Sequence, residues 1–293
     1  MSIFLTGSSG FVGTSFLNTF NNEVVRVSSR GQEYKIDDAE VVIHLAGKAH
    51  DLKKTSAIQE YYRVNTVLTK IVYDAFLASE SNVFITLSSV KAVADEVEGA
   101  LIEDHGPNPI THYGKSKLLA EKYIFSKEIP EGKRVYILRP CMIHGPGNKG
   151  NLNLLYKIVS KSIPWPLGAF ENKRSFCSID NLMFIFKELI ERDDIPSGIY
   201  NVADDEPLST NELIGLIAQS QNRNPKLWDI SKKFIEGIAS VGDKLRLPLN
   251  TEPLQKLTSS YVVSNDKIKT AIGKPLPVSS REGLLKTFKS FNS

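Results

Sequence analysis

A short apolar run followed by a glycine-rich turn opens the chain, and this arrangement restricts the fold. Ile3-Phe4-Leu5-Thr6 has the β-branched and aromatic residues of a strand, and residues 7–13 follow it as G-x-x-G-x-x-G. Residues 14–20 then show helical spacing of apolar side chains. A strand, a glycine turn and a helix in this order are typical of dinucleotide binding, because backbone N–H groups can approach a pyrophosphate at the positive helix end. The sequence therefore predicts an α/β protein with a Rossmann-type, doubly wound parallel sheet.

Further strand-like and helical segments alternate along the chain. Strands are predicted at 24–27, 41–43, 83–89, 135–138 and 198–203, and helices at 56–79, 113–126, 151–161 and 181–192. Apolar residues recur at helical spacing from Val64 to Phe76. We expect a seven-stranded, mostly parallel sheet in a domain formed by 1–146 and 174–204. Residues 147–173 and 205–293 are expected to form a small, mainly helical substrate lobe that ends in a helix at 281–291.

Composition excludes several classes of protein. Apolar residues make up 41% and charged residues 24% of the 293 positions, which is typical of a soluble globular protein. The net charge is only +3, and no Lys/Arg run is dense enough for a nucleic-acid or membrane patch. No stretch is long and apolar enough to span a bilayer, and the first strand leaves no room for a targeting peptide. We expect a cytoplasmic protein with no nucleic-acid partner and no membrane partner.

Neither the cysteines nor the histidines indicate a special site. Cys141 and Cys177 lie in apolar, strand-like runs, where buried thiols are expected rather than a disulfide. The five histidines have no metal-ligand spacing with cysteines or carboxylates. The sequence therefore predicts no metal.

Tyr113 and Lys117 lie four residues apart in a predicted helix, so both side chains should project from one face. A nearby Lys cation favours the phenolate, which can then exchange a proton near neutral pH. A surface Lys beside an amphipathic Tyr would give the same pattern. Ser89 ends the predicted strand 83–89, and the carboxyl ends of parallel strands face the ligand crevice. Ser89 could therefore bond the oxygen that Tyr113 protonates, although a lone Ser at a strand end is more often a cap.

These motifs together resemble the extended short-chain dehydrogenase/reductase family, specifically its nucleotide-sugar epimerases and reductases. The resemblance covers nearly the whole chain. Besides the three motifs above, it includes Val41-Val42-Ile43-His44-Leu45-Ala46-Gly47, Tyr62-Arg63-Val64-Asn65, Leu138-Arg139-Pro140, Ile143-His144-Gly145-Pro146-Gly147, Arg174-Ser175-Phe176 with Asp180-Asn181, and Gly198-Ile199-Tyr200-Asn201-Val202.

The resemblance implies a role for individual residues. Tyr113 is the acid/base, Lys117 lowers its pKa and holds a nicotinamide ribose hydroxyl, and Ser89 bonds the reacting oxygen. Arg174 stands where relatives bind a sugar-nucleotide diphosphate, and Lys256 and Asn151 are further substrate candidates. The residues expected to bind the dinucleotide are Gly7, Ser9, Gly10, Phe11, Val12, Gly13, Ser28, Arg30, Leu45, Ala46, Gly47, Lys48, Asn65, Ser88, Tyr113, Lys117, Pro140 and Ile143.

The end of the second strand bears on the choice of cofactor. An acidic residue at this position usually holds the ribose hydroxyls of NAD. Here Ser28 stands there and Arg30 follows, a pair that suits a 2′-phosphate and favours NADP over NAD. Arg30 could instead be a solvated loop charge. Relatives usually have a helix and a strand in the next interval, whereas this chain has only a short segment, with at most a strand at 34–36.

Three reactions compete on this scaffold. Relatives that act as 4,6-dehydratases carry Asp-Glu just after the catalytic hydroxyl, where this chain has Val90-Lys91-Ala92, so dehydration is disfavoured. A 4-epimerase and a 4-ketoreductase acting on a UDP-(N-acetyl)hexose or its 4-keto-6-deoxy derivative remain open.

A non-catalytic dinucleotide-binding sensor or scaffold is the alternative class of function. Such proteins typically lose the Tyr or the Lys, and both are present.

The resemblance also implies a homodimer. Family members pair the helices corresponding to 64–79 and 113–126 into a four-helix bundle. The expectation depends on apolar residues on the exposed side of these helices, such as Val72, Phe76, Leu119 and Tyr123, although these could equally belong to the core of one chain.

Overall fold

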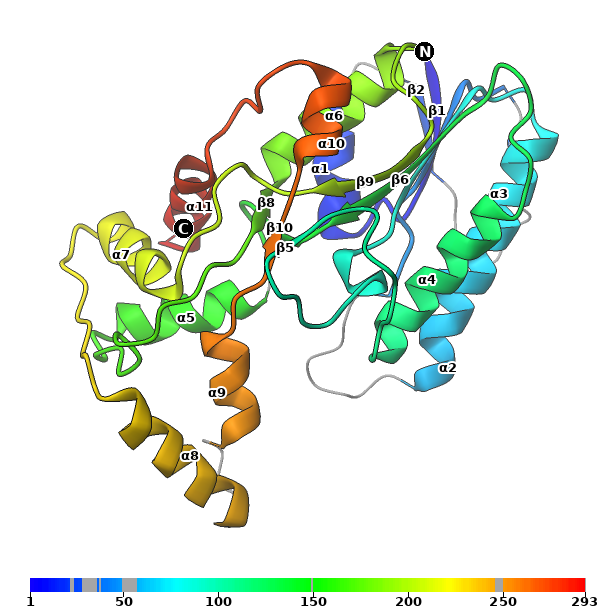
Figure 1. Ribbon diagram of the computed structural model, residues 1–293. Helices are drawn as coiled ribbons and strands as arrows, with labels where there is room; N and C mark the ends of the chain where they lie inside the picture. The colour runs from blue at the N-terminus through cyan, green and yellow to red at the C-terminus, as the bar shows by residue number, and fades with distance from the viewer. Residues whose placement is uncertain are drawn as a thin grey trace.

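Six parallel strands form the central sheet of the computed structural model (Figure 1). Across the sheet they are β2 (Val24–Val27), β1 (Ser2–Thr6), β3 (Val41–His44), β4 (Val83–Leu87), β6 (Arg134–Pro140) and β9 (Gly198–Val202). The structure describes residues 1–21, 24–27, 36, 38–48, 57–148, 150–245 and 250–292. The strand order reverses at β1, and α/β sheets bind ligands at such a switch point.

The predicted parallel sheet is confirmed, but the number of strands is not. In the described ranges the sheet has six strands, where seven were expected. Only residues 28–40 join β2 to β3. Tyr34 and Lys35, in the expected short strand, lie outside the described residues.

Alternate side chains of the strands pack into two separate layers. Ile3 and Leu5 of β1 join one apolar cluster, whereas Phe4 between them joins the other. This follows from the two-residue period of a strand, and both faces of the sheet are apolar because helices cover both. Helices α1 (Phe11–Thr19), α6 (Ile179–Glu191) and α10 (Asp266–Ile272) cover the first face, and α3 (Leu68–Ala78) and α4 (His112–Phe125) cover the second (Figure 1).

The predicted helix 56–79 contains an irregular segment. α2 (Ile58–Tyr61) continues into a π-helical segment, Tyr62–Val67, and then into α3. Such π segments occur often at functional sites. Val72 and Phe76 of α3 are fully buried in the second layer, so of the two alternatives for these residues the core position is correct. They face the sheet because α3 packs its apolar stripe on Phe84 of β4.

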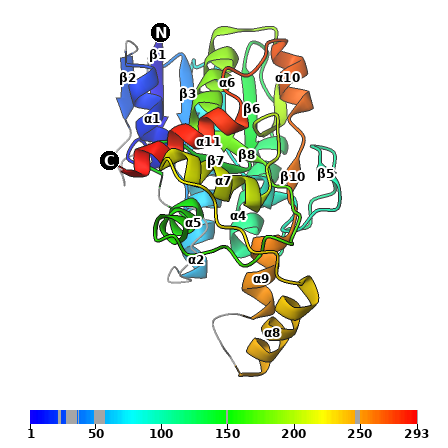
Figure 2. The ribbon, with the colours of Figure 1, turned by 90° about the vertical axis from the view of Figure 1, so that its left-hand side faces the viewer.

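A second, mainly helical group of elements lies beyond the sheet (Figures 1 and 2). Its helices are α5 (Asn151–Ser160), α7 (Thr210–Ser220), α8 (Lys232–Leu245), α9 (Thr251–Thr258) and α11 (Ser280–Lys289). Short strands β7 (Met142–His144) and β8 (Phe176–Ser178) pair with each other, as do β5 (Ala100–Leu101) and β10 (Val262–Val263). Single 3₁₀ turns lie at Val90–Ala92 and Ser290–Asn292.

Capping boxes set the starts of two lobe helices. Ser209 with Glu212 begins α7, and Ser279 with Glu282 begins α11. Ile268 of α10 packs in the first layer of the sheet, so this part of the range 205–293 lies against the sheet. The domain boundaries themselves stay a prediction.

Two expectations from composition can be compared with the structure. Cys141 and Cys177 are free thiols, with Cys177 buried and Cys141 half-buried, and the predicted lack of a disulfide between them is confirmed. Over the ranges described, no helix combines the length and the apolar character needed to cross a bilayer.

His44 at the end of β3 leads to a prediction about acid stability. Its ring nitrogens contact the hydroxyls of Thr6 at 2.7 Å and Thr69 at 2.9 Å. Burial, and to a smaller extent the charge of Lys117, lower the pKa of His44 from 6.5 to about 3. As the pH falls from 6.5 towards 3, the unfolded chain takes up this proton and the native chain does not, so stability present above pH 6.5 is lost.

We expect His44→Gln to remove this part of the acid sensitivity. The stability advantage of the wild type over the variant should shrink by roughly 1.4 kcal/mol per pH unit within that window. Urea unfolding of both proteins at a series of pH values measures the difference. A difference that stays constant from neutral to acid pH would show that His44 titrates alike in both states.

Candidate active site

The glycine turn after β1 packs tightly against the loop after β3. Gly7 has φ of +77°, and a Cβ there would lie 2.4 Å from the backbone nitrogen of Ala46. A Cβ on Gly13 would lie 2.2 Å from the carbonyl oxygen of Gly7. Helix α1 begins after Gly10 without a side-chain cap. The N–H groups of its first turn can therefore bind an anion, so this turn fits the pyrophosphate of a dinucleotide.

Asn65 ties three segments together at the same end of the sheet. It is fully buried in the π-helical segment. Its Oδ1 accepts a hydrogen bond from the N–H of Lys48 at 2.7 Å, and its Nδ2 donates to the Lys48 carbonyl at 3.1 Å. Nδ2 also donates to the hydroxyl of Ser116 in α4 at 3.0 Å. The π segment thus places one amide between the loop after β3 and the helix that carries Tyr113.

Lys117 reaches from α4 to the carboxyl end of β4. Its Nζ donates a hydrogen bond to the carbonyl of Leu87 at 2.8 Å. A Cβ on Gly47 would lie 3.2 Å from this Nζ and 3.3 Å from Oδ1 of Asn65, so only glycine leaves space in front of the ammonium group. Burial lowers the pKa of Lys117 to about 8, opposed by the carboxylate of Glu121. The open face beside Gly47 fits a ribose hydroxyl.

Tyr113 and Ser89 meet as the sequence predicted. Ser89 is buried and begins the 3₁₀ turn Val90–Ala92, where its Oγ also accepts from the N–H of Lys91 at 3.2 Å. A side-chain hydrogen bond joins Ser89 to Tyr113. The ring of Tyr61 lies edge-on to that of Tyr113, with centroids 6.3 Å apart. The capping role and the contact with Tyr113 therefore coexist at Ser89.

The expected pKa of Tyr113 requires a correction. We expected Lys117 to lower it, whereas burial raises the pKa of Tyr113 above its usual value of 10. The hydrogen bond with Ser89 lowers it in part, and the proximity of Tyr61 raises it. The ammonium group of Lys117 donates a hydrogen bond to the Leu87 carbonyl, and its charge is not among the causes that shift the pKa of Tyr113.

Behind the site, a buried ion pair links α4 to β6. Nε and Nη2 of Arg139 donate to the two carboxylate oxygens of Glu121 at 3.0 and 2.6 Å. The hydroxyl of Ser88 donates to the same carboxylate. Glu121 stands one helical turn after Lys117, so this pair fixes the helix face that carries the site.

Two cations, Lys91 and Arg174, lie near each other where the residues after Ser89 pack against the start of α4. The carbonyl of Lys91 packs so closely on Gly114 that a Cβ there would approach to 2.2 Å. Nζ of Lys91 lies over the ring of Tyr261, 4.3 Å from its centroid, and donates to the carbonyl of Asp95 at 2.8 Å. Burial lowers the pKa of Lys91, the carboxylate of Asp95 raises it, and the guanidinium of Arg174 lowers it.

Arg174 reaches this place through backbone pairing. Its N–H donates to the carbonyl of Leu208 at 2.9 Å, and the adjacent chain runs beside Tyr261. The sequence indicated Arg174 as a substrate-binding residue. Lys91 entered the sequence analysis only because it stands where dehydratases have an acidic pair. The signal that could have identified Lys91 was its position, two residues after Ser89.

The other predicted residues fall into three groups. Ser9, Phe11 and Val12 lie in the turn and the start of α1, Leu45 follows β3, and Pro140 and Ile143 lie in β6 and β7. Ser28 and Arg30 lie outside the described residues. The preference for NADP, which depends on these two residues, therefore stays a prediction. Asn151 begins α5 and Lys256 lies in α9, but their side chains are not among those described. Among the described residues, no group of His, Cys, Asp and Glu could hold a metal ion.

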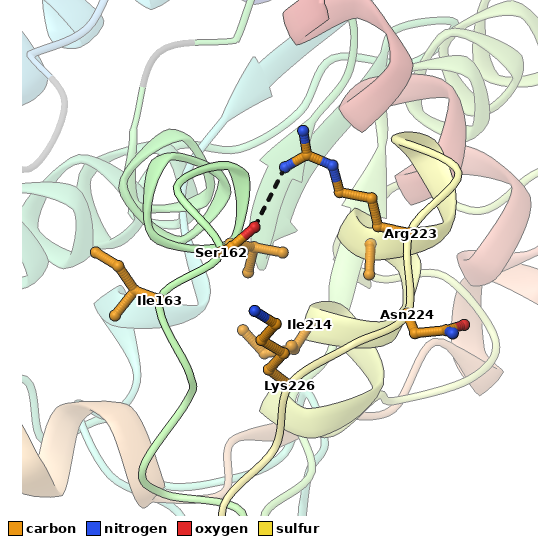
Figure 3. Close-up of a pocket in the computed structure, with 8 residues that line it drawn as sticks. Ser162, Ile163, Ile214, Arg223, Asn224 and Lys226 are labelled. Carbon is orange, nitrogen blue, oxygen red and sulfur yellow. Dashed lines mark hydrogen bonds between the residues drawn. The ribbon is translucent and has the colours of Figure 1, made fainter.

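A small hollow in the lobe lies apart from these residues. Figure 3 shows it between the end of α5 and helix α7, where Arg223 bonds to Ser162. It is lined by Val159, Ser162, Ile163, Ile214, Ala218, Arg223, Asn224 and Lys226. None of the predicted site residues lines it, so it carries no functional assignment.

Solved structures share this fold over the whole chain. UDP-glucuronic acid 4-epimerase from Bacillus cereus, in complex with NAD, superposes with a TM-score of 0.75 at 19% identity and covers 100% of this chain and 99% of its own. RMD from Pseudomonas aeruginosa, complexed with NADPH, has a TM-score of 0.74 at 19% identity, with both chains fully covered. At this identity the likeness shows the fold alone.

Sequence relatives are closer. The chain is 28% identical over 323 residues to the UDP-glucose 4-epimerase of Vibrio cholerae, which covers 99% of this chain and 95% of the relative. It is also 28% identical over 244 residues to the N-acetyl-alpha-D-glucosaminyl-diphospho-ditrans,octacis-undecaprenol 4-epimerase of Escherichia coli O157:H7, covering 76% of this chain and 73% of the relative. A model of the NAD dependent epimerase/dehydratase family matches residues 24–203, more than half of the chain, and the protein therefore belongs to this family.

Proposed function

We propose that the protein is an NAD(P)-dependent 4-epimerase or 4-ketoreductase of a diphosphate-linked hexose. The observation that carries the proposal is the meeting of Ser89, Tyr113 and Lys117 beside the glycine turn. Epimerization is favoured, because the relative aligned over nearly the whole chain is named a 4-epimerase. A 4,6-dehydratase is disfavoured by Lys91 at the place of the acid pair. The presence of both Tyr113 and Lys117 argues against a sensor or scaffold.

The proposed roles follow from the contacts. When bound, NAD or NADP supplies the hydride chemistry. Tyr113 transfers the proton of the reacting hydroxyl, and burial favours its protonated phenol, which can donate to a 4-keto oxygen. Ser89 bonds the same oxygen while charge develops on it. Lys117 holds the ribose through the open face beside Gly47.

The diphosphate of the substrate is proposed to bind at Arg174 and Lys91. A guanidinium group donates in a fork that matches phosphate oxygens, and an ammonium group adds a compact charge. One relative is named for UDP-glucose and another for a sugar diphosphate on undecaprenol, so the diphosphate is their shared group. We propose a UDP-sugar, with Lys256 and Asn151 as further contacts, and a cytoplasmic reaction.

Lys91→Met should weaken substrate binding. The variant keeps the aliphatic length over Tyr261 but removes the cation. A charge-assisted hydrogen bond contributes about 1.5–3 kcal/mol, so KM for the sugar diphosphate should rise by roughly 10- to 100-fold. The dinucleotide Kd should stay unchanged, and Lys91→Arg should restore much of the KM. Steady-state kinetics and cofactor titration measure both. An unchanged KM would remove Lys91 from the substrate site.

One assay tests the reaction. The protein is incubated with NAD+ and, separately, with NADH or NADPH, together with a panel of UDP-linked 4-hydroxy and 4-keto sugars. Interconversion of two 4-hydroxy epimers without net cofactor change identifies an epimerase, and stoichiometric oxidation of NAD(P)H with a 4-keto sugar identifies a reductase. If no substrate reacts while the dinucleotide still binds, the non-catalytic sensor would be favoured.

Tighter binding of NADPH than of NADH would support the cofactor preference inferred from Ser28 and Arg30.

We propose that two copies pair through α3 and α4. Val72 and Phe76 are core residues, but Ile71 and Leu119 are exposed, at 48% and 45%. Sedimentation equilibrium at micromolar concentration should show a dimer. Ile71→Glu with Leu119→Glu should give a folded monomer, because burying two carboxylates at an interface is costly. Ile110→Glu, at an exposed loop position, serves as the control. A monomeric wild type would refute the pairing.

A further inference from the structure

Helix α8 has an apolar face that neither the sheet nor the lobe covers. Ile235 and Ala239 are buried in the lobe cluster together with Leu254 of α9. Phe234, Ile238 and Val241 are instead exposed, at 61%, 40% and 52%. Their spacing of four and three residues puts them on one face of the helix. Thus α8 carries two apolar faces, of which one packs on the protein and the other meets solvent.

The surrounding region strengthens this feature. Leu227 and Trp228, just before α8, are also exposed, so five large exposed apolar side chains fall within residues 227–241. The others among the described residues are scattered along the chain. Figures 1 and 2 both place α8 at the far end of the lobe, away from the sheet. A gathered apolar surface of this kind marks an interaction site.

The charges on α8 are sorted around this face. Lys233 and Lys244 are eleven residues apart, about three turns, and lie in one line along the border of the apolar face. Glu236 and Asp243, seven residues apart, lie together on the side opposite to that face. Apolar side chains bordered by lysines, with carboxylates turned away, match the surface of an anionic bilayer.

We propose that α8 docks the protein on a phospholipid bilayer that carries anionic headgroups. Phe234, Ile238 and Val241 enter the acyl boundary, and Lys233 and Lys244 contact the phosphates. A second copy of the chain fits less well. In an antiparallel self-pairing, Lys233 of one copy would lie beside Lys244 of the other, and like charges would meet. The proposal departs from the expectation of no membrane partner, which considered spanning segments and dense basic runs only.

Docking would bring the proposed diphosphate site near the bilayer. Helix α9 packs on α8, and Nε2 of Gln255 in α9 donates to Glu96 at 3.2 Å. The charge of Glu96 acts on Lys91, one of the two cations proposed to bind the diphosphate. One helix therefore separates the apolar face from the edge of the site. The docking itself does not depend on the reaction proposed above.

Co-sedimentation of the full chain with vesicles tests the proposal. The protein should bind vesicles of phosphatidylglycerol and phosphatidylcholine, bind pure phosphatidylcholine less, and lose affinity as salt is raised. Phe234→Ser with Ile238→Ser should lower the apparent affinity at least about tenfold. Phe125→Ser, which removes a similarly exposed aromatic residue at the end of α4, should bind as the wild type.

A second variant separates charge from apolar contact. Lys233→Glu with Lys244→Glu leaves the apolar face intact and should abolish the preference for anionic vesicles. The proposal is overturned if the wild type ignores anionic vesicles or if both double variants bind like the wild type. It is also overturned if the serine variant changes the oligomeric state in sedimentation equilibrium, which would assign the face to protein pairing.

Discussion

Tyr113→Phe is expected to lower turnover of the sugar by about 10²–10⁴-fold, the usual contribution of a general acid or base. The substitution keeps the ring beside Tyr61 and removes the phenolic proton that Ser89 orients. Folding and dinucleotide binding should survive, because the substitution keeps the ring and its packing. Single-turnover kinetics with a 4-keto sugar, together with cofactor titration, measure the two quantities separately.

Matched variants show whether the loss is specific to proton transfer. Tyr123→Phe makes the same change on the same helix, where the hydroxyl bonds to Asp74 on the exposed side, and should keep full turnover. Ser89→Ala should cost less than Tyr113→Phe, since it removes one hydrogen bond and leaves the proton donor. Lys117→Ala should both slow turnover and weaken dinucleotide binding. Full activity in Tyr113→Phe would refute the mechanism for epimerization and reduction alike.

Glu121→Ala is expected to destabilise the protein by about 3–5 kcal/mol. Glu121 is 2% exposed and Arg139 4%, and the pair is bidentate. Removing the carboxylate leaves a buried guanidinium without its counterion and takes the acceptor from Ser88. Urea unfolding measures the loss, and a fall in activity should accompany it, because Glu121 stands one turn after Lys117.

An exposed ion pair of similar geometry provides the control. Arg192 and Asp194 approach to 2.6 Å, as do Arg139 and Glu121, but Asp194 lies in solvent. Asp194→Ala should leave the unfolding midpoint nearly unchanged, since solvent screens such pairs. Equal losses of stability in the two variants would show that burial does not increase the contribution of the Glu121–Arg139 pair.

Local patterns in the sequence determined the architecture. The glycine turn after the first strand, the alternation of side chains around Phe4 and the strand positions were all predictable, because each depends on neighbours within a few residues. The four-residue spacing of Tyr113 and Lys117 likewise placed both on α4, and the position of Ser89 at a strand end brought it to Tyr113.

Contacts between distant segments decided the rest. Burial raises the pKa of Tyr113, and Lys117 bonds to the Leu87 carbonyl, neither of which follows from helical periodicity. The sequence left open whether Val72 and Phe76 are exposed or in the core, and packing of α3 on the sheet buries them. The surroundings of Lys91 depend on Arg174 and Tyr261, which lie far along the chain: the charge of Arg174 acts on Lys91, and the ring of Tyr261 lies under its Nζ. Spacing along a chain determines which side chains share a face, whereas the solvent and the charges that surround them are set only when the elements pack together.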